Sequence, residues 1–238
     1  MNRAAFALVS TAALTASAVA GGDGDVGFRF LDGSVITTIA LDDQFDTEAA
    51  FPEGFEVERV FGVDFDSTGA VDEPGFYINS FSRIPGLRDL SLTYTQQPLR
   101  VFDGTDFVAT DHTLTQINGI PGVNEISSPT TGTSGGWVFP ISVPTSGPFE
   151  FDNHPDFQLD NGSDALVAGA YLWEIEFNFI DASDNVVFST DSVGLVFNFG
   201  LSEEDHDEAI EAAEAIIPTP GAAAVLAMAG IGASRRRR

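Results

Sequence analysis

The feature that most constrains the fold is a nine-residue run in which apolar and polar side chains alternate. Residues 171–179 read YLWEIEFNF, and single glutamates separate Trp173, Ile175 and Phe177. A period of two places every second side chain on the same face of a β-strand, whereas a helix needs a period near 3.6. This segment is therefore predicted to be a strand with one buried face.

Shorter runs of the same period recur between residues 21 and 200, and Asp-Gly, Asn-Gly and Pro-Gly pairs separate them. Such pairs are strong turn formers, and the spacing predicts roughly ten to fourteen short strands. Many short strands joined by turns are typical of an antiparallel β-sandwich or a jelly roll. The predicted fold class is therefore all-β, with an antiparallel β-sandwich or jelly-roll-like body.

Helical spacing occurs once in the body, near its end. Residues 202–205 read SEED, which has the S-x-x-D form of a capping box, and alanines and isoleucines follow at helical spacing. The acidic residues in the first turn favour the helix dipole, and Pro218 ends the run. We expect a short acidic helix or linker over residues 202–217, after a β-sandwich domain of residues 21–201.

The charge of the body restricts its partners. Between residues 23 and 214 the chain has 36 carboxylates against five arginines and no lysine, which gives a net charge of −31. Such a field repels phosphate backbones, so the composition excludes a nucleic-acid-binding function. The same field favours divalent cations and basic partners.

The N-terminal residues 1–20 predict export. Arg3 precedes a long apolar run, and the small-residue pattern Ala18-Val19-Ala20 stands directly before Gly21. This is the organisation of a secretory signal peptide and its cleavage site. The chain has no cysteine and 21 phenylalanines, so we expect an aromatic core instead of disulfide bonds in the exported domain.

The C-terminal residues 218–238 predict a membrane segment. Fourteen uncharged residues follow Pro220, and four consecutive arginines come directly after them. A helix of that length spans about 21 Å, against roughly 30 Å for the hydrocarbon core, and snorkelling arginines shorten the difference. The positive-inside rule would leave the arginines in the cytoplasm and the body outside. A plain C-terminal membrane helix is the alternative to a sorting signal.

The order of a proline motif, a short small-residue helix and terminal arginines resembles the PEP-CTERM sorting tail. Thr219 stands where the usual motif has glutamate. The resemblance implies an exosortase-type processing enzyme as partner, transient inner-membrane anchoring, and delivery to the cell surface, the outer membrane or an exopolysaccharide matrix. The sorting motif that it implies consists of Pro218, Thr219, Pro220, Arg235, Arg236, Arg237 and Arg238.

Five stretches of the body resemble planctomycete PEP-CTERM surface proteins whose activity is undetermined. Where those proteins often carry H-x-H-x-x-F, this chain has a single histidine, His154. The resemblance therefore brings no activity with it. The stretches are EPGF (73–76), FDGTDF (102–107), NHPDFQL (153–159), AGAYLWEIEF (168–177) and SVGLVFNFGLSEEDHDEAI (192–210).

One of these stretches is a candidate metal site. Asp152, His154 and Asp156 are spaced by two, so that all three could project from one face of a strand. A histidine with two carboxylates is a plausible half-site for zinc or calcium. The alternative is a solvated turn, because Pro155 disfavours a regular central strand. The Asp/Gly-rich residues 21–27 are interpreted as a flexible lead.

The sequence does not predict an enzyme. The chain has three histidines, and none lies beside a recognisable nucleophile motif. The leading hypothesis is an exported, non-catalytic surface or matrix protein. One alternative is a carbohydrate-binding module or adhesin on exopolysaccharide, for which an exposed aromatic platform would be diagnostic. The other alternative is a surface protein that binds a divalent metal.

Overall fold

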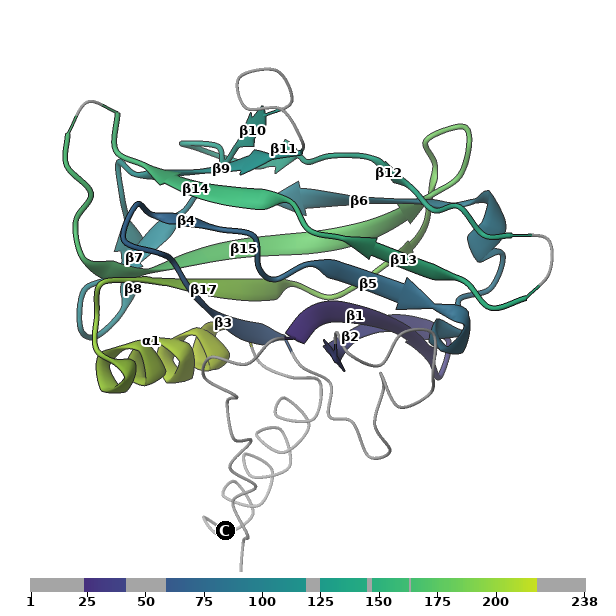
Figure 1. Ribbon diagram of the computed structural model, residues 1–238, viewed down its shortest axis with the longest axis horizontal. Coiled ribbons are helices and arrows are strands. Elements are labelled where there is room, and N and C mark those ends of the chain that lie inside the picture. Colours follow the sequence, from purple (N-terminus) through teal and green to yellow (C-terminus); the bar gives the residue numbers. More distant parts are fainter. Residues whose placement is uncertain (1–23, 42–58, 119–124, 145–146, 163, 218–238) are drawn as a thin grey trace, which may run out of the picture.

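The computed structural model of the chain describes residues 24–41, 59–118, 125–144, 147–162 and 164–217 (Figure 1). Within these residues seventeen strands form three sheets, and one α-helix follows the last strand. The prediction of an all-β, sandwich-like body is confirmed. The expected signal peptide (1–20) and sorting tail (218–238) lie outside the described residues.

The largest sheet has nine strands. Its main path runs β11-β6-β15-β17-β3, while β12 pairs with β6, β16 and β7 pair with β15, and β8 pairs with β7. The strands are β3 (Val60–Asp64), β6 (Ser91–Gln96), β7 (Arg100–Phe102), β8 (Phe107–Ala109), β11 (Ser134–Gly135), β12 (Phe139–Pro140), β15 (Gly169–Ile180), β16 (Val186–Ser189) and β17 (Val193–Phe199).

The two smaller sheets have four strands each, in the orders β13-β5-β1-β2 and β10-β9-β14-β4. The first contains β1 (Gly24–Leu31), β2 (Ser34–Leu41), β5 (Phe76–Asn79) and β13 (Glu150–Asn153). The second contains β4 (Ala70–Val71), β9 (Thr113–Ile117), β10 (Glu125–Ser127) and β14 (Asp156–Asp160). The helix is α1 (Glu203–Ile216), and short 3₁₀ turns span Ser80–Ser82 and Leu87–Asp89.

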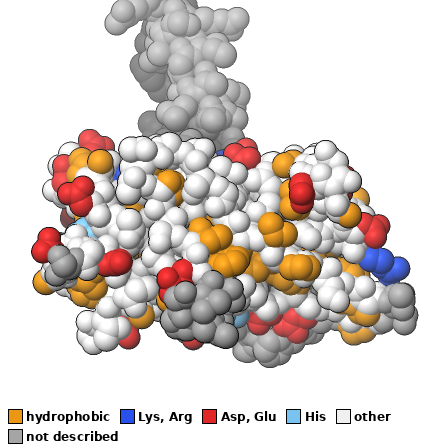
Figure 2. Space-filling view, turned by 90° about the horizontal axis from the view of Figure 1, so that it is seen from above, with side chains coloured by type: hydrophobic (Ala, Val, Ile, Leu, Met, Phe, Trp, Pro, Cys, Tyr) orange, Lys and Arg blue, Asp and Glu red, His pale blue; other side chains and the backbone are white. Residues whose placement is uncertain are grey.

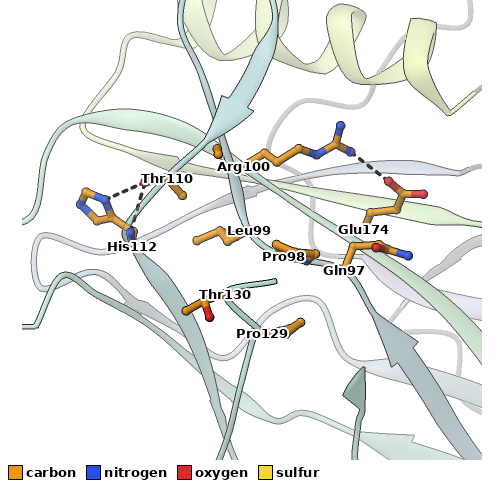
Figure 3. Close-up of a pocket in the computed structure, with 10 residues that line it drawn as sticks. Gln97, Pro98, Leu99, Arg100, Thr110, His112, Pro129, Thr130 and Glu174 are labelled. Atoms are coloured by element: carbon orange, nitrogen blue, oxygen red, sulfur yellow. Dashed lines mark hydrogen bonds and ion pairs between the residues drawn. The ribbon is translucent and has the colours of Figure 1, made fainter. Parts of the chain in front are cut away.

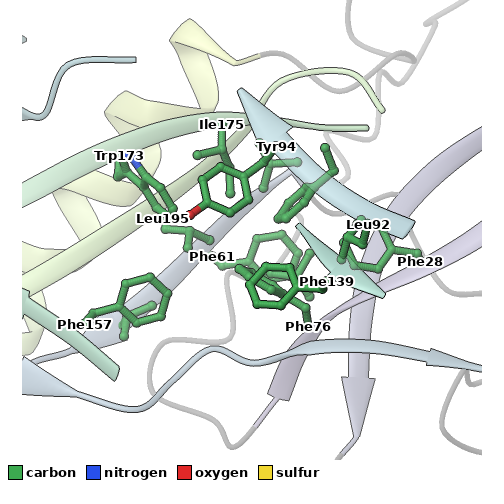
Figure 4. Close-up of a cluster of buried hydrophobic side chains, with 14 of the residues drawn as sticks. Phe28, Phe61, Phe76, Leu92, Tyr94, Phe139, Phe157, Trp173, Ile175 and Leu195 are labelled. Carbon is green, nitrogen blue, oxygen red and sulfur yellow. The ribbon is translucent and has the colours of Figure 1, made fainter. Parts of the chain in front are cut away.

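The alternating run of the sequence forms β15, between β6 and β17 (Figure 1). Both smaller sheets pack against one face of this strand. The Phe28 ring of β1 lies 4.8 Å from that of Phe177, and the Phe157 ring of β14 lies 5.8 Å from Trp173. Figure 4 shows part of this core, with Phe157 and Trp173 toward one end and Phe28 toward the other. The nine-stranded sheet is therefore one layer, and the smaller sheets form the other.

The opposite face of β15 is covered by α1. Leu172 of β15 and Val196 of β17 belong to the same buried cluster as Ile210 of the helix. The Ser202 hydroxyl oxygen accepts a hydrogen bond from the Asp205 amide at 3.2 Å, as the capping-box pattern predicts. The helix is thus confirmed, and it packs on the sheet.

The prediction that all strand pairs are antiparallel is wrong in two places. Strand β1 pairs with β5 in parallel, with Val26 opposite Phe76, and β3 pairs with β17 in parallel. Parallel neighbours need long crossover connections, which local turn motifs in the sequence do not reveal. The β1–β5 pairing has a direct consequence, because it places Asp25 beside the residues that precede β5.

Across the part of the chain that the structure describes, no helix is both long enough and apolar enough to span a bilayer.

Candidate metal centre

Four ionisable side chains meet where β1, β5 and β13 lie side by side. Asp25 belongs to β1, Glu73 precedes β5, Asp152 belongs to β13, and His154 directly follows β13. Asp25, Glu73 and His154 each offer one ligand atom, and these atoms all lie within 4.8 Å of one another. Segments that are far apart in the sequence therefore converge on one group of nitrogen and oxygen donors.

The imidazole of His154 has acidic oxygens at both nitrogens. Its Nε2 lies 2.8 Å from Asp152 Oδ1 and 3.5 Å from Asp25 Oδ2. Its Nδ1 lies 3.4 Å from Glu73 Oε1 and 3.3 Å from the carbonyl oxygen of Asp72. Such a ring can be protonated and donate hydrogen bonds to these oxygens, or it can be neutral and coordinate a cation through one nitrogen.

Gly75 allows the close approach of these groups. Its N–H donates to Asp25 Oδ1 at 2.6 Å and to Glu73 Oε2 at 3.2 Å. A Cβ atom at this position would lie only 2.6 Å from Asp25 Oδ1 and 2.8 Å from His154 Nε2. Only a residue without a side chain fits here, so the backbone at Gly75 acts as one wall of the site.

The site concentrates negative charge around a side chain that is almost completely buried. Asp25 is 1% exposed, whereas the side chains of Asp152 and His154 are 32% and 31% exposed. Burial alone would lower the pKa of His154. The negative charges of Asp25, Asp152 and Glu73 together raise this pKa by more than burial lowers it, so it lies above its usual value. Without a cation, the protonated imidazole supplies part of the positive charge that these carboxylates need.

The structure brings together two of the three residues that the sequence proposed. Asp152 and His154 are in contact, but Asp156 lies in another sheet, at the start of β14, where it pairs with Ile117 of β9. The expectation that all three share one strand face is wrong, because β13 ends at Asn153. The chain passes into the next strand at Pro155, whose ring nitrogen cannot donate to a strand ladder.

Asp25 and Glu73 were missed by the sequence reasoning. The residues around Asp25 were interpreted as a flexible lead, yet Asp25 lies within β1 and is buried. Glu73 lies in the EPGF stretch, where the only usable pattern was a turn. Their proximity follows from the parallel pairing of β1 with β5, and local spacing carries no information about that pairing.

The other two histidines have different surroundings. His206 of α1 is 3% exposed, and its Nε2–H donates to the Val196 carbonyl oxygen at 2.9 Å. This bond ties the helix to β17, which is a structural role. His112 lies beside Thr110, with 3.0 Å between its Nδ1 and the threonine hydroxyl oxygen.

The described residues do not expose the aromatic platform expected of a carbohydrate-binding module. Among the described residues, the large apolar side chains that are exposed are all aliphatic, and Trp173 and Tyr77 are at most 1% exposed. On the face shown in Figure 2, acidic side chains are scattered and basic ones are confined to its margin. This distribution agrees with the strongly acidic composition.

No family model, curated protein or solved structure matches the chain. Its function must therefore be argued from the site itself and from the two ends of the sequence.

Proposed function

We propose that this protein is an exported, non-catalytic surface or matrix protein whose β-sandwich binds one divalent cation. The observation that carries the cation site is the convergence of Asp25, Glu73 and His154 donor atoms within 4.8 Å. Asp152 contacts the same imidazole and would lie beside the ion. A jelly-roll-like course of the chain and a C-terminal membrane helix belong to the same proposal.

The spacing of the donors supports a small cation with mixed nitrogen and oxygen ligands. Ligand atoms about 2.0–2.1 Å from a tetrahedral zinc ion are roughly 3.3 Å apart. His154 Nε2 and Asp25 Oδ2 are 3.5 Å apart, close to this spacing, whereas Glu73 Oε1 lies beside the other ring nitrogen and would have to turn toward an ion bound at Nε2. Calcium prefers six to eight oxygens, and an imidazole nitrogen is a poor ligand for it. Zinc is therefore the favoured ion.

The role that the site supports is structural. Its ligands come from β1, from the connection before β5 and from the residue after β13. An ion held by all three would tie the first described strand to the rest of its sheet. It would also cancel part of the repulsion among the carboxylates of a highly acidic body.

Export and sorting are proposed from the two ends of the chain. The signal-peptide pattern of residues 1–20 and the PEP-CTERM-like tail of residues 218–238 support secretion, transient anchoring and exosortase-type processing. The same resemblance supports display at the cell surface or in an exopolysaccharide matrix.

The cation site is tested by thermal unfolding of the purified protein after treatment with a chelator. Addition of zinc should raise the melting temperature, since an ion that binds only the folded state stabilises it. Asp25→Asn should abolish most of this shift. Asp156→Asn is the matched control and should leave the shift unchanged, because Asp156 lies in a different sheet. An equal zinc shift in all three proteins would refute the assignment of the ligands.

A further inference from the structure

A pocket of about 410 Å³ lies away from the cation site, within the range of roughly 300–1,000 Å³ typical of small-molecule sites. Its lining comes from five parts of the chain, shown in Figure 3. These are the β6–β7 connection, the paired strands β7 and β8, the segment before β9, the loop after β10, and β15.

The polar groups of the pocket are held on rigid elements. Arg100 of β7 donates to Glu174 of the central strand β15 at 2.9 Å, and the two side chains are 26% and 23% exposed. The amide N–H of Gln97 donates to the backbone carbonyl of Glu174 at 2.9 Å, which fixes the adjacent wall. A guanidinium, a carboxylate and a carboxamide therefore face one space, and they provide hydrogen-bond donors and acceptors together.

The pocket has little net charge. The charges of Arg100 and Glu174 cancel each other. Burial lowers the pKa of His112, although the charges of Asp111 and Asp160 oppose this effect. His112 is therefore a neutral imidazole at neutral pH. An anionic ligand would meet the field of an acidic body, and a cationic ligand would compete with Arg100 for Glu174.

Apolar side chains supply part of the remaining lining, beside the hydroxyl-bearing Thr110 and Thr130. Pro98, Leu99 and Pro129 form part of the wall. A sugar ring presents hydroxyl groups at its edge, which both donate and accept, and C–H groups on its faces. The combination of a compensated ion pair, a carboxamide and apolar faces matches that pattern.

We propose that this pocket binds a neutral, hydroxyl-rich ligand of the saccharide class, with Arg100, Glu174 and Gln97 as its hydrogen-bonding groups. Recognition through hydrogen bonds in a pocket does not need an exposed aromatic platform, and the part of the chain that the structure describes has none. Without aromatic stacking the affinity should be modest, with a Kd of about 1 mM for a single sugar unit. The proposal is independent of the cation site.

The test is ligand-observed NMR on the full chain with glucose, galactose, mannose and N-acetylglucosamine as probes, and with glucuronic acid and glucosamine as charged comparisons. At least one neutral sugar should bind, in the presence of a chelator as well as in its absence. Arg100→Ala and Glu174→Gln should each weaken binding about tenfold or more. Gln97→Ala, which leaves the ion pair in place, should also weaken binding.

Arg88→Ala is the matched control, since Arg88 donates to the carbonyl oxygen of Pro144 outside the pocket. It should leave sugar binding unchanged. Circular dichroism would verify that each variant is folded. The proposal is overturned if no neutral sugar binds at tens of millimolar, if only the charged sugars bind, or if binding survives all three pocket substitutions.

Discussion

Replacing Gly75 by alanine is a purely steric perturbation of the cation site. Gly75 is not among the glycines with positive φ, so its backbone conformation is open to alanine. The added Cβ would nevertheless lie 2.6 Å from Asp25 Oδ1 and 2.8 Å from His154 Nε2, whereas real Cβ contacts below 3.0 Å essentially never occur. Asp25, His154 or both must therefore move.

The expected cost follows from the bond that this movement weakens. The Gly75 N–H donates to Asp25 Oδ1 at 2.6 Å, and a hydrogen bond to a charged group contributes about 1.5–3 kcal/mol. Alanine recovers about 0.4–1 kcal/mol by restricting the unfolded chain. The net loss should be about 1–2 kcal/mol, which lowers the melting temperature of a domain of this size by about 2–8 °C.

The Gly75→Ala substitution should weaken zinc binding more strongly than it weakens folding. The same N–H orients Asp25 toward the ion, and removing such a supporting bond typically weakens metal binding by about 10- to 100-fold. Zinc titration calorimetry on the purified protein measures this effect. Gly135→Ala is the matched control, because nothing lies within 4 Å of a Cβ placed at that position. Equal zinc affinity in the Gly75→Ala variant and the control would refute the steric argument.

Three further predictions concern the core, the protonation of the site and the two ends of the chain. Phe177 is fully buried, so Phe177→Asp should destabilise the domain by about 5 kcal/mol or more in urea unfolding, and unchanged stability would mean that its side chain faces solvent. In the presence of a chelator, the neighbouring carboxylates hold the pKa of His154 above its usual value despite burial, so the protonated ring stabilises the fold fully below about pH 6.5. The difference in unfolding free energy between wild type and His154→Gln should therefore be largest near pH 5.5 and shrink as the pH rises through the raised pKa. A difference that grows with pH would contradict the direction of this pKa shift. Intact-mass analysis of surface material should find a chain that begins near Gly21 and lacks residues 235–238, while a mature chain that keeps the four arginines would leave only the plain anchor.

Local patterns in the sequence predicted the elements that depend on local physics. The alternation in residues 171–179 identified the central strand, because a strand with one face against the smaller sheets must repeat every two residues. The capping box identified α1 because the Ser202 side chain bonds within its own turn. The alternation did not show that Leu172 would also be buried, since that depends on α1 packing over the second face.

Only half of the cation site could be predicted, because local patterns in the sequence do not show which distant segments pair. Asp152 and His154 are neighbours in the sequence, so their contact follows from short-range geometry. Asp25 and Gly75 are 50 positions apart, and their hydrogen bond depends on the parallel pairing of β1 with β5. No local motif encodes that register. Pro155 did disfavour a regular central strand through this stretch, and the structure has a break between β13 and β14 at that point.

The most direct test of the central claim is the position of a bound ion. Crystals of the protein grown with zinc should give an anomalous-difference peak at the zinc absorption edge. We predict one peak about 2.0–2.2 Å from a nitrogen of His154 and from carboxylate oxygens of Asp25 and Glu73. A strong zinc peak elsewhere, such as the open groove lined by Asp64, Asp66 and Asp156, with none beside His154, would contradict the account.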